Sequence, residues 1–377
     1  MYLKKISLRN FRNYAQEKTS FSPGICLVQG ANGQGKSNLL EAIYSLCFGR
    51  TFRNIRERDL VRWNEPYYYL QGILHLQERY VKVELGYELS KKRKVIKING
   101  KTTGQFRLAQ YCPVVFFIPE DLELIRRGPE ERRRYLDREL SQESTLYAEL
   151  ISRYNRVIYQ KNRILKERKR YNEIIEMLRP WNKQVVYLGS RIIHKRARAI
   201  SAWNKLAAKN YKILFQNDQK MKIVYNNIVG EEVEDTTIAE IEEKFERKII
   251  SKEKEEWERG FSLLGPHRDD VIFLLNGRDA KRFASHGQQR SVVIALKAAQ
   301  IQLFNEKKEK PLFIVDDVFS ELDEKRKKQC FLLLQEAEQV FLTVTEKSSL
   351  NNFLDQVELS SFVRIKEGKI LESKNDG

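Results

Sequence analysis

The chain has 377 residues, and its 69 Lys and Arg outnumber its 51 Asp and Glu, so the formal net charge is +18 at pH 7. A surplus of this size favours a polyanionic partner, either nucleic acid or an anionic membrane surface. No stretch reaches the roughly 18 consecutive apolar residues of a membrane span, and the N-terminus lacks a signal-like apolar region, so we expect a cytoplasmic protein. The four cysteines and four histidines are scattered, which argues against a disulfide framework and a zinc site.

The first 120 residues favour strands and short loops with one strong helix. Residues 2–14 alternate apolar and polar side chains, as a half-buried strand does. Residues 24–30 form a short apolar run bounded by glycines, which is typical of a buried strand. Residues 70–100 predict a meander with a turn at Asn99-Gly100, and residues 112–119 predict another buried strand.

The pattern changes after Gly128-Pro129, where apolar residues recur at helical spacing in a polar sequence. Residues 153–212 contain 17 Lys and Arg and three acids, a net charge of +14, and an acidic stretch follows at 231–258. Alternating strand and helix patterns return from residue 260. We therefore predict an α/β head with a mixed, partly antiparallel sheet (residues 1–128 and 260–377), interrupted by a mainly helical insertion (129–259), basic and then acidic.

The segment GANGQGKS, Gly30–Ser37, fits the P-loop pattern G-x-x-x-x-G-K-[ST] between a predicted strand and a predicted helix. Backbone N–H groups of such a loop surround phosphate oxygens, and the helix N-terminus adds partial positive charge. We expect Lys36 to reach the β- and γ-phosphates of a nucleotide and the Ser37 hydroxyl to bind Mg²⁺. The predicted nucleotide-binding residues of the loop are Gly30, Ala31, Asn32, Gly33, Gln34, Gly35, Lys36 and Ser37. The alternative is a glycine-rich turn that binds nothing, which leaves the Lys-Ser pair unexplained.

The segment PLFIVDDVFSELD, residues 311–323, is an apolar strand that ends in two carboxylates, as a Walker B segment does. We expect Asp316 to bind the Mg²⁺ held by Ser37, and Asp317 to orient or deprotonate the attacking water. Two acids after a strand also suit a turn that caps a helix. The P-loop elsewhere in the chain favours the catalytic interpretation.

The segment FASHGQQR, residues 283–290, places Ser285 and Gln288 at the spacing of a capping box. The apolar residues that follow predict a buried helix. The N-terminus of this helix is a second anion-binding site in addition to the P-loop. A single nucleotide does not need two such sites from the same chain. A plain capped helix is the alternative.

The order of these motifs, P-loop, long insertion, Ser-x-Gly-Gln, Walker B and Ser-x-Leu-Asp, resembles the ABC-type ATPase heads of chromosome-maintenance and repair proteins. The resemblance implies that Ser285, Gly287 and Gln288 act in trans, on the γ-phosphate bound by the opposite subunit. It also implies a D-loop at the dimer interface, with Ser320 and Asp323. The chain departs from the pattern at His286, and in place of the usual switch histidine it offers Thr345 or Glu346.

The segments ISLRNFRNY, GANGQGKSNLLEAIY, FFIPEDLELIRRGPEERRRYLD, LLGPHRDD and DDVFSELD together resemble the RecF family of bacterial recombination mediators. The resemblance implies that Arg12 and Asn13 lie near the base and phosphates, and that Glu120 replaces the Q-loop residue. It further implies ATP and Mg²⁺ as cofactors, slow DNA-stimulated ATP hydrolysis, and an ATP-sandwiched homodimer on duplex or gapped DNA. RecR as a partner, recombinase loading at single-strand gaps, and a nucleoid-associated location follow from the same resemblance.

The basic part of the insertion, interleaved with tyrosines, suits neutralisation of DNA phosphates. No base-reading motif is visible, so we expect binding without sequence preference. A solvated helical face is the alternative. The predicted DNA contacts are Lys161, Arg163, Arg168, Lys169, Arg170, Arg191, Lys195 and Arg196. For GPHRDD, residues 265–270, a turn into a strand is favoured over a metal site.

Three other functions account for these motifs less well. A transporter-type ABC subunit does not explain the basic insertion. A chromosome organiser with long coiled coils needs sustained heptads, and the sequence between Ser37 and Ser285 shows none. A small-molecule kinase leaves residues 283–290 without a role.

Overall fold

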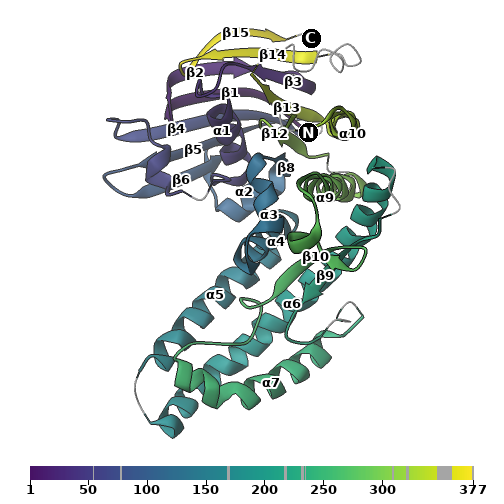
Figure 1. Ribbon diagram of the computed structural model, residues 1–377. Helices are drawn as coiled ribbons and strands as arrows, with labels where there is room; N and C mark the ends of the chain where they lie inside the picture. Colours follow the sequence, from purple (N-terminus) through teal and green to yellow (C-terminus); the bar gives the residue numbers. More distant parts are fainter. Residues whose placement is uncertain are drawn as a thin grey trace. The chain divides into compact units, whose positions relative to one another are not determined.

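The computed structural model describes residues 1–53, 55–76, 79–167, 170–215, 219–230, 233, 235–307, 310–319, 322–345 and 359–375 (Figure 1). The chain forms two compact units, residues 1–121 with 296–377 and residues 122–295. The second unit therefore extends past residue 259, where the predicted insertion ends. Among the described residues, no helix combines the length and the apolar character that crossing a membrane requires.

The first unit contains an antiparallel sheet in the order β2-β1-β4-β5-β6-β7. Its side chains alternate between faces, so that Ile6 and Leu8 are buried whereas Lys5 and Arg9 are exposed. The strands are β1 (Tyr2–Phe11), β2 (Tyr14–Ser20), β4 (Tyr67–Leu76), β5 (Arg79–Glu88), β6 (Arg93–Ile98) and β7 (Lys101–Thr102).

The second sheet of this unit has the order β15-β14-β3-β13-β12-β8 and is parallel except for the β14–β15 pair. Its strands are β3 (Gly24–Gln29), β8 (Val114–Phe117), β12 (Leu312–Val315), β13 (Gln339–Val344), β14 (Leu359–Lys366) and β15 (Lys369–Asn375). All four residues of β8 and of β12 are buried, as continuous apolar runs in parallel sheets are. This mixed sheet confirms the predicted α/β class. Because only β13 separates β3 from β12, the segments that follow these two strands lie near each other.

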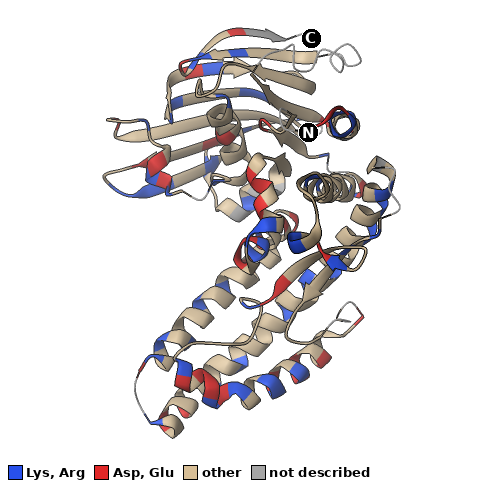
Figure 2. Cartoon of the chain, in the orientation of Figure 1, with Lys and Arg blue, Asp and Glu red and all other residues tan. Residues whose placement is uncertain are grey.

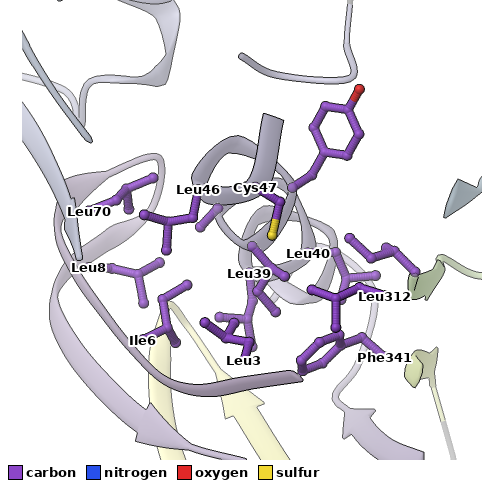
Figure 3. Packing of buried hydrophobic residues seen from close by; sticks show 14 of the residues in the cluster. Leu3, Ile6, Leu8, Leu39, Leu40, Leu46, Cys47, Leu70, Leu312 and Phe341 are labelled. Carbon is purple, nitrogen blue, oxygen red and sulfur yellow. The ribbon is translucent and has the colours of Figure 1, made fainter. Parts of the chain in front are cut away.

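Helix α1 (Lys36–Phe48) joins the two sheets, since it contacts β1, β4 and β5 of the first and β8 and β13 of the second. Figure 3 shows its leucines Leu39, Leu40 and Leu46 packed among side chains of both sheets. Burial of each such leucine side chain contributes about 1.5–3 kcal/mol to the free energy of unfolding. The start of α1 is therefore fixed by a large core. Shorter elements of the unit are η1 (Glu57–Leu60), α2 (Gln105–Tyr111) and α10 (Glu324–Leu334), and the last residue of η2 (Pro119–Leu122) belongs to the second unit.

The second unit is mainly helical, with a small antiparallel sheet in the order β11-β10-β9. Strand β10 pairs with β9 and not with a head sheet, which is why residues 260–295 group with the helices. The helices are α3 (Glu123–Arg126), α4 (Pro129–Glu143), α5 (Thr145–Leu165), α6 (Tyr171–Phe215), α7 (Ile238–Arg259) and α8 (Ala280–Phe283), and the strands are β9 (Met221–Asn226), β10 (Asp270–Leu275) and β11 (Arg278–Asp279). Helix α9 (His286–Glu306) begins in this unit and ends in the other.

Helix α6 runs through Pro180, although the sequence predicts a helical block that starts near residue 181. Proline lacks an N–H and clashes with the preceding turn, so it favours a helix boundary. Packing outweighs this preference, because α6 lies against both α5 and α7. Next to the proline, Asn182 Nδ2 donates a hydrogen bond to Glu253 Oε1 of α7 at 3.2 Å.

Candidate nucleotide and DNA-binding sites

The loop between β3 and α1 is held open by two glycines with positive φ, Gly33 at 77° and Gly35 at 119°. A Cβ at Gly35 would lie 2.7 Å from Asn13 Nδ2, so a side chain there would collide with the loop's support. Asn13 Nδ2 donates to the Gln34 carbonyl at 3.0 Å, and the Tyr14 hydroxyl donates to the Gly35 carbonyl at 2.9 Å. The predicted nucleotide-binding residue Asn13 thus shapes the loop itself.

Lys36 is the first residue of α1, and only 6% of it is exposed. Its Nζ donates to the carbonyl oxygens of Gly30 at 2.6 Å and Ala31 at 3.1 Å. Burial lowers the pKa of the ammonium, and the charges of Asp317 and Asp316 act in the opposite direction. The fold therefore brings the lysine of the loop into the electrostatic field of both predicted Walker B carboxylates.

Asp316 and Asp317 follow β12, and the hydroxyl of Thr343 on β13 holds both of them. Thr343 Oγ1 donates to Asp316 Oδ1 at 2.8 Å and accepts from the Asp317 N–H at 2.8 Å. Asp317 has a φ of 48°, a conformation that costs a non-glycine residue on the order of 1 kcal/mol. Sequence reasoning missed Thr343, and its one signal is a buried hydroxyl in the otherwise apolar run VFLTV.

The P-loop and the two carboxylates after β12 are together called the P-loop corner. Their chemistry fits a magnesium nucleotide. Mg²⁺ prefers oxygen ligands and is usually held by one or two carboxylates together with substrate phosphates. Ser37, half-buried in the first turn of α1, and Asp316, buried after β12, supply a hydroxyl and a carboxylate. Residues 31–33 of the loop are exposed, so its outer side is accessible to phosphates.

Arg12, predicted to lie near the nucleotide, forms a two-pronged ion pair with the fully buried Glu41 of α1. Its Nε and Nη2 donate to the two Glu41 carboxylate oxygens at 2.8 and 3.2 Å. The Thr51 hydroxyl donates to the same carboxylate, and the Arg53 guanidinium lies 3.7 Å from it. Glu41 is a second residue that sequence reasoning missed, although it is the only acid in the apolar helix KSNLLEAIYSLCF.

Glu120, predicted as the Q-loop substitute, is exposed in η2. The buried carboxylate of this turn is the neighbouring Asp121, which accepts from the Ile118 N–H at 2.9 Å and from Lys297 Nζ at 3.1 Å. Glu120 is thus a surface carboxylate on a turn that Asp121 fixes in place.

The expected capping box is present at the start of α9. The Ser285 N–H donates to Gln288 Oε1 at 2.7 Å, and the Gln288 N–H donates to Ser285 Oγ at 3.3 Å. Ser285 and His286 are exposed, and Gly287 is half-buried. Behind them the buried Gln289 accepts from Arg126 Nε at 2.9 Å. Residues 285–288, called the signature segment, therefore present an exposed helix N-terminus that the capping box holds.

In the predicted D-loop, Asp323 caps α10 by accepting from the Arg326 N–H at 2.9 Å. Burial raises the pKa of Asp323, but the hydrogen bonds and charge of Arg326 lower it more, so the net pKa is below its usual value. Ser320 and Glu346 lie outside the described residues, and Thr345 is half-buried after β13.

Two of the predicted DNA contacts are wrong, because Lys161 and Arg196 are buried in the second unit. Lys161 Nζ lies 2.6 Å from Glu256 Oε2 with neither side chain exposed by more than 1%. The Arg196 guanidinium donates to Asp137 at 2.7 Å and to Asp269 at 3.3 Å. Sequence charge alone does not separate these interior cations from surface ones.

The other predicted DNA contacts differ in exposure. Arg163 and Arg170 are exposed and Lys195 is half-buried. Arg191 is half-buried and donates to Glu242 Oε1 of α7 at 2.5 Å and to the Tyr187 carbonyl at 2.7 Å. Arg168 and Lys169 lie outside the described residues.

Helix α5 carries an exposed basic stripe (Arg153, Arg156 and Arg163) together with the exposed ring of Tyr159. Their spacing of three to four residues places them on one helix face. Figure 2 shows basic residues recurring along α5, whereas α7 carries basic and acidic residues side by side. Arg153 and Arg156 were not among the predicted contacts.

The segment GPHRDD forms a turn into β10, as the sequence favours, and its polar side chains are tied to the second unit. The geometry fits a neutral His267, with Nδ1 accepting from the Tyr154 hydroxyl at 2.8 Å and Nε2 donating to the Ser262 carbonyl at 3.3 Å. Arg132 Nε donates to Asp270 at 2.6 Å.

Acidification is expected to destabilise the second unit through His267. Burial lowers the pKa of His267 to about 3, whereas an unfolded histidine titrates near 6.5. Below pH 6.5 the unfolded chain takes up a proton that the folded chain refuses, so stability is lost as the pH falls. Between pH 7.5 and 5 the loss should be about 1–2 kcal/mol larger for the parent than for His267→Gln.

The measurement is urea unfolding followed by tryptophan fluorescence, since Trp181, Trp203 and Trp257 of the chain's four tryptophans lie in this unit. Equal pH dependence in the parent and in His267→Gln would contradict a neutral, buried His267.

Comparisons with known proteins agree with this arrangement. The family described as RecF/RecN/SMC N terminal domain matches residues 2–367. The DNA replication and repair protein RecF of Natranaerobius thermophilus is 35% identical over 381 residues, covering 99% of this chain and 98% of that protein. RecF of Bacillus mycoides is 36% identical over 357 residues, covering 93% and 94%.

Solved structures give the same result. A structure described as the recombination mediator protein RecF with ATP in the RecFOR pathway aligns with a TM-score of 0.87 and 33% identity, covering 99% of both chains. An Smc head bound to the C-terminal winged-helix domain of ScpA aligns with a TM-score of 0.56 at 16% identity, which supports the ABC-type head fold alone. With its family match, full-length relatives and P-loop corner, the chain belongs to the RecF family of ABC-type ATPases.

Proposed function

We propose that the chain is an ATP-controlled DNA-binding protein of recombinational repair. The proposal rests on the arrangement of two sets of residues. Lys36 interacts electrostatically with both Walker B carboxylates in one unit, and the Ser285 capping box is exposed at a helix N-terminus. An exposed anion-binding terminus suits a phosphate that another copy of the chain supplies. The relatives' names and the ATP in a related structure support the same function.

Within one copy, each residue at the P-loop corner has a separate task. The loop N–H groups and Lys36 hold the nucleotide phosphates, with Ser37 and Asp316 as donors to Mg²⁺, which would supply charge neutralisation. Thr343 fixes the Asp316 carboxylate, and the positive φ of Asp317 turns its backbone at the end of β12. We assign Asp317 the task of orienting the attacking water. Turnover in this proposal is slow and DNA-stimulated, and it acts as a switch.

Two copies complete the machinery, since Ser285, Gly287 and Gln288 of one copy act on the phosphate held by the other. The D-loop residues Ser320 and Asp323 belong to the same dimer interface. The dimer binds duplex or gapped DNA without reading bases, because cations on α5 neutralise phosphates. It cooperates with RecR to load recombinase at single-strand gaps, in the cytoplasm and on the nucleoid. ATP hydrolysis releases the DNA.

Removing the exposed cations Arg156 and Arg163 of α5 together should weaken ATP-dependent binding to gapped duplex. The slope of log K against log salt is negative, and each lost phosphate contact makes it shallower by about 0.9. The slope for the Arg156→Ala/Arg163→Ala chain should therefore be shallower than the parent's by about two. The measurement is fluorescence anisotropy across a salt series. An unchanged slope would contradict the placement of DNA on α5.

The control is Lys161→Met/Glu256→Gln, which removes a cation of the same insertion together with the charge of its buried partner. The side-chain oxygen of the glutamine can still accept from the Ser262 hydroxyl and the Leu263 N–H, as Glu256 does. Neutralising both members of a buried ion pair together leaves no unpaired charge in the interior. This variant should keep the parent's DNA affinity and salt slope, because Lys161 does not reach the surface.

A further inference from the structure

The antiparallel sheet of the first unit buries one face against α1, and its other face contains a groove of about 530 Å³. Gly86 of β5 lies at the centre of this face, paired with Tyr69 on β4 and with Val95 on β6. Arg9 of β1 pairs with Tyr69 from the other side. Paired residues on adjacent strands share a face, so Arg9, Tyr69, Gly86 and Val95 form one row.

The fold does not require glycine at position 86. A Cβ there would lie 3.5 Å from the Tyr68 carbonyl oxygen and 3.6 Å from Tyr69 Cδ2, which are ordinary contacts. The missing side chain leaves a gap beside the Tyr69 ring. Glycine inside a strand weakens it and often marks a place where a ligand approaches the backbone closely.

The groove combines aromatic rings with positive charge. The Arg9 guanidinium lies 5.7 Å from the centre of the Tyr67 ring, and Arg93 is exposed at the other side. Within the described part of the chain, neither Arg9 nor Arg93 lies within 4.0 Å of a carboxylate. Arg93 lies opposite Glu88 in the sheet, where the hydrogen bond from Lys91 and, to a lesser extent, the charge of Arg93 lower the pKa of that carboxyl.

The carboxylates on this face already have partners. Glu84 accepts from the Tyr69 hydroxyl at 2.5 Å and lies 3.2 Å from Lys82 Nζ. Glu88 lies 3.0 Å from Lys91 Nζ. The groove is therefore complementary to an anion that carries a flat ring.

We propose that this groove binds single-stranded DNA, with an unpaired base over Gly86 against the Tyr69 ring and flanking phosphates near Arg9 and Arg93. Proteins that bind single strands combine aromatic stacking platforms with cationic grooves in this way. Bases of a duplex are stacked on one another and cannot enter. The inference goes beyond the proposed function, since it requires neither nucleotide nor dimer.

The test uses Gly86→Leu, which fills the gap in an extended strand without a positive φ. Fluorescence anisotropy without ATP measures binding of a labelled oligo-dT and of a blunt duplex. Loss of the stacking site should weaken oligo-dT binding about tenfold, with duplex binding changed less than twofold. Tyr67→Ala, at a half-exposed ring of the same groove, should act in the same direction.

Arg93→Ala should make the negative slope of log K against log salt for oligo-dT shallower by about 0.7, the value for one phosphate contact to a single strand. Lys101→Ala removes an exposed cation of the same sheet outside the groove and should leave oligo-dT binding unchanged. Oligo-dT binding that Gly86→Leu and Tyr67→Ala leave intact overturns the proposal and leaves the groove to a protein partner. A repeat in Lys36→Arg separates this outcome from a failure of the ATP switch, because groove binding should survive that change.

Discussion

A chain with Lys36→Arg should hydrolyse ATP at least about a hundredfold more slowly than the parent, the loss typical for one electrostatic donor to a transition state. Lys36 Nζ fits between two loop carbonyls at 2.6 and 3.1 Å, and the residue is 6% exposed. A planar guanidinium is larger and presents its donors in a rigid fork, so it cannot repeat this geometry. Phosphate release at saturating ATP measures the effect.

Lys101→Arg, on an exposed strand of the same unit, is the matched control and should hydrolyse ATP at the parent rate. ATP-driven dimerisation should fail in Lys36→Arg as well, because the phosphates are no longer positioned for the partner's signature segment. Hydrolysis at the parent rate in Lys36→Arg would remove Lys36 from the site.

Replacing Ser285 by Arg should leave nucleotide binding intact and abolish ATP-dependent dimerisation. Ser285 is exposed at the start of α9, and an arginine there would occupy the space of the partner's γ-phosphate. Loss of the cap costs about 1 kcal/mol, which is too little to unfold the unit. Binding of a fluorescent ATP analogue and sedimentation velocity separate the two effects.

Ser285→Thr keeps the hydroxyl and the cap, so it should still dimerise with ATP. A Ser285→Arg chain that sediments as a dimer with ATP would contradict the action of the signature segment in trans.

The features that sequence predicts best are local. The P-loop needs glycines at fixed offsets between a strand and a helix, and the positive φ of Gly33 and Gly35 meets that need. The capping box of Ser285 and Gln288 spans four residues, so its hydrogen bonds follow from spacing. Continuous apolar runs likewise indicated the buried strands of the parallel sheet.

The features that sequence missed depend on residues far apart in the chain. Thr343 reaches Asp316 because β13 and β12 are neighbours, and Glu41 holds Arg12 across 29 residues. The charge run of the insertion suggested a surface, yet Lys161 and Arg196 are interior because acids at positions 256, 137 and 269 are brought to them. Strand β9, whose pairing groups residues 260–295 with the helices, lies beside β10, with Asn226 opposite Asp270 and Met221 opposite Leu275.

The central claim is that each ATP site is shared between two copies, and a mixing experiment tests it most directly. Ser285→Ala and Lys36→Arg chains are each expected to hydrolyse ATP poorly alone. In a mixed dimer, the intact P-loop of the first chain meets the intact signature segment of the second. Each mixed dimer holds one complete site, so the mixture should hydrolyse ATP well above the average of the two separate chains. Activity that stays at the average of the two separate chains would contradict the shared site.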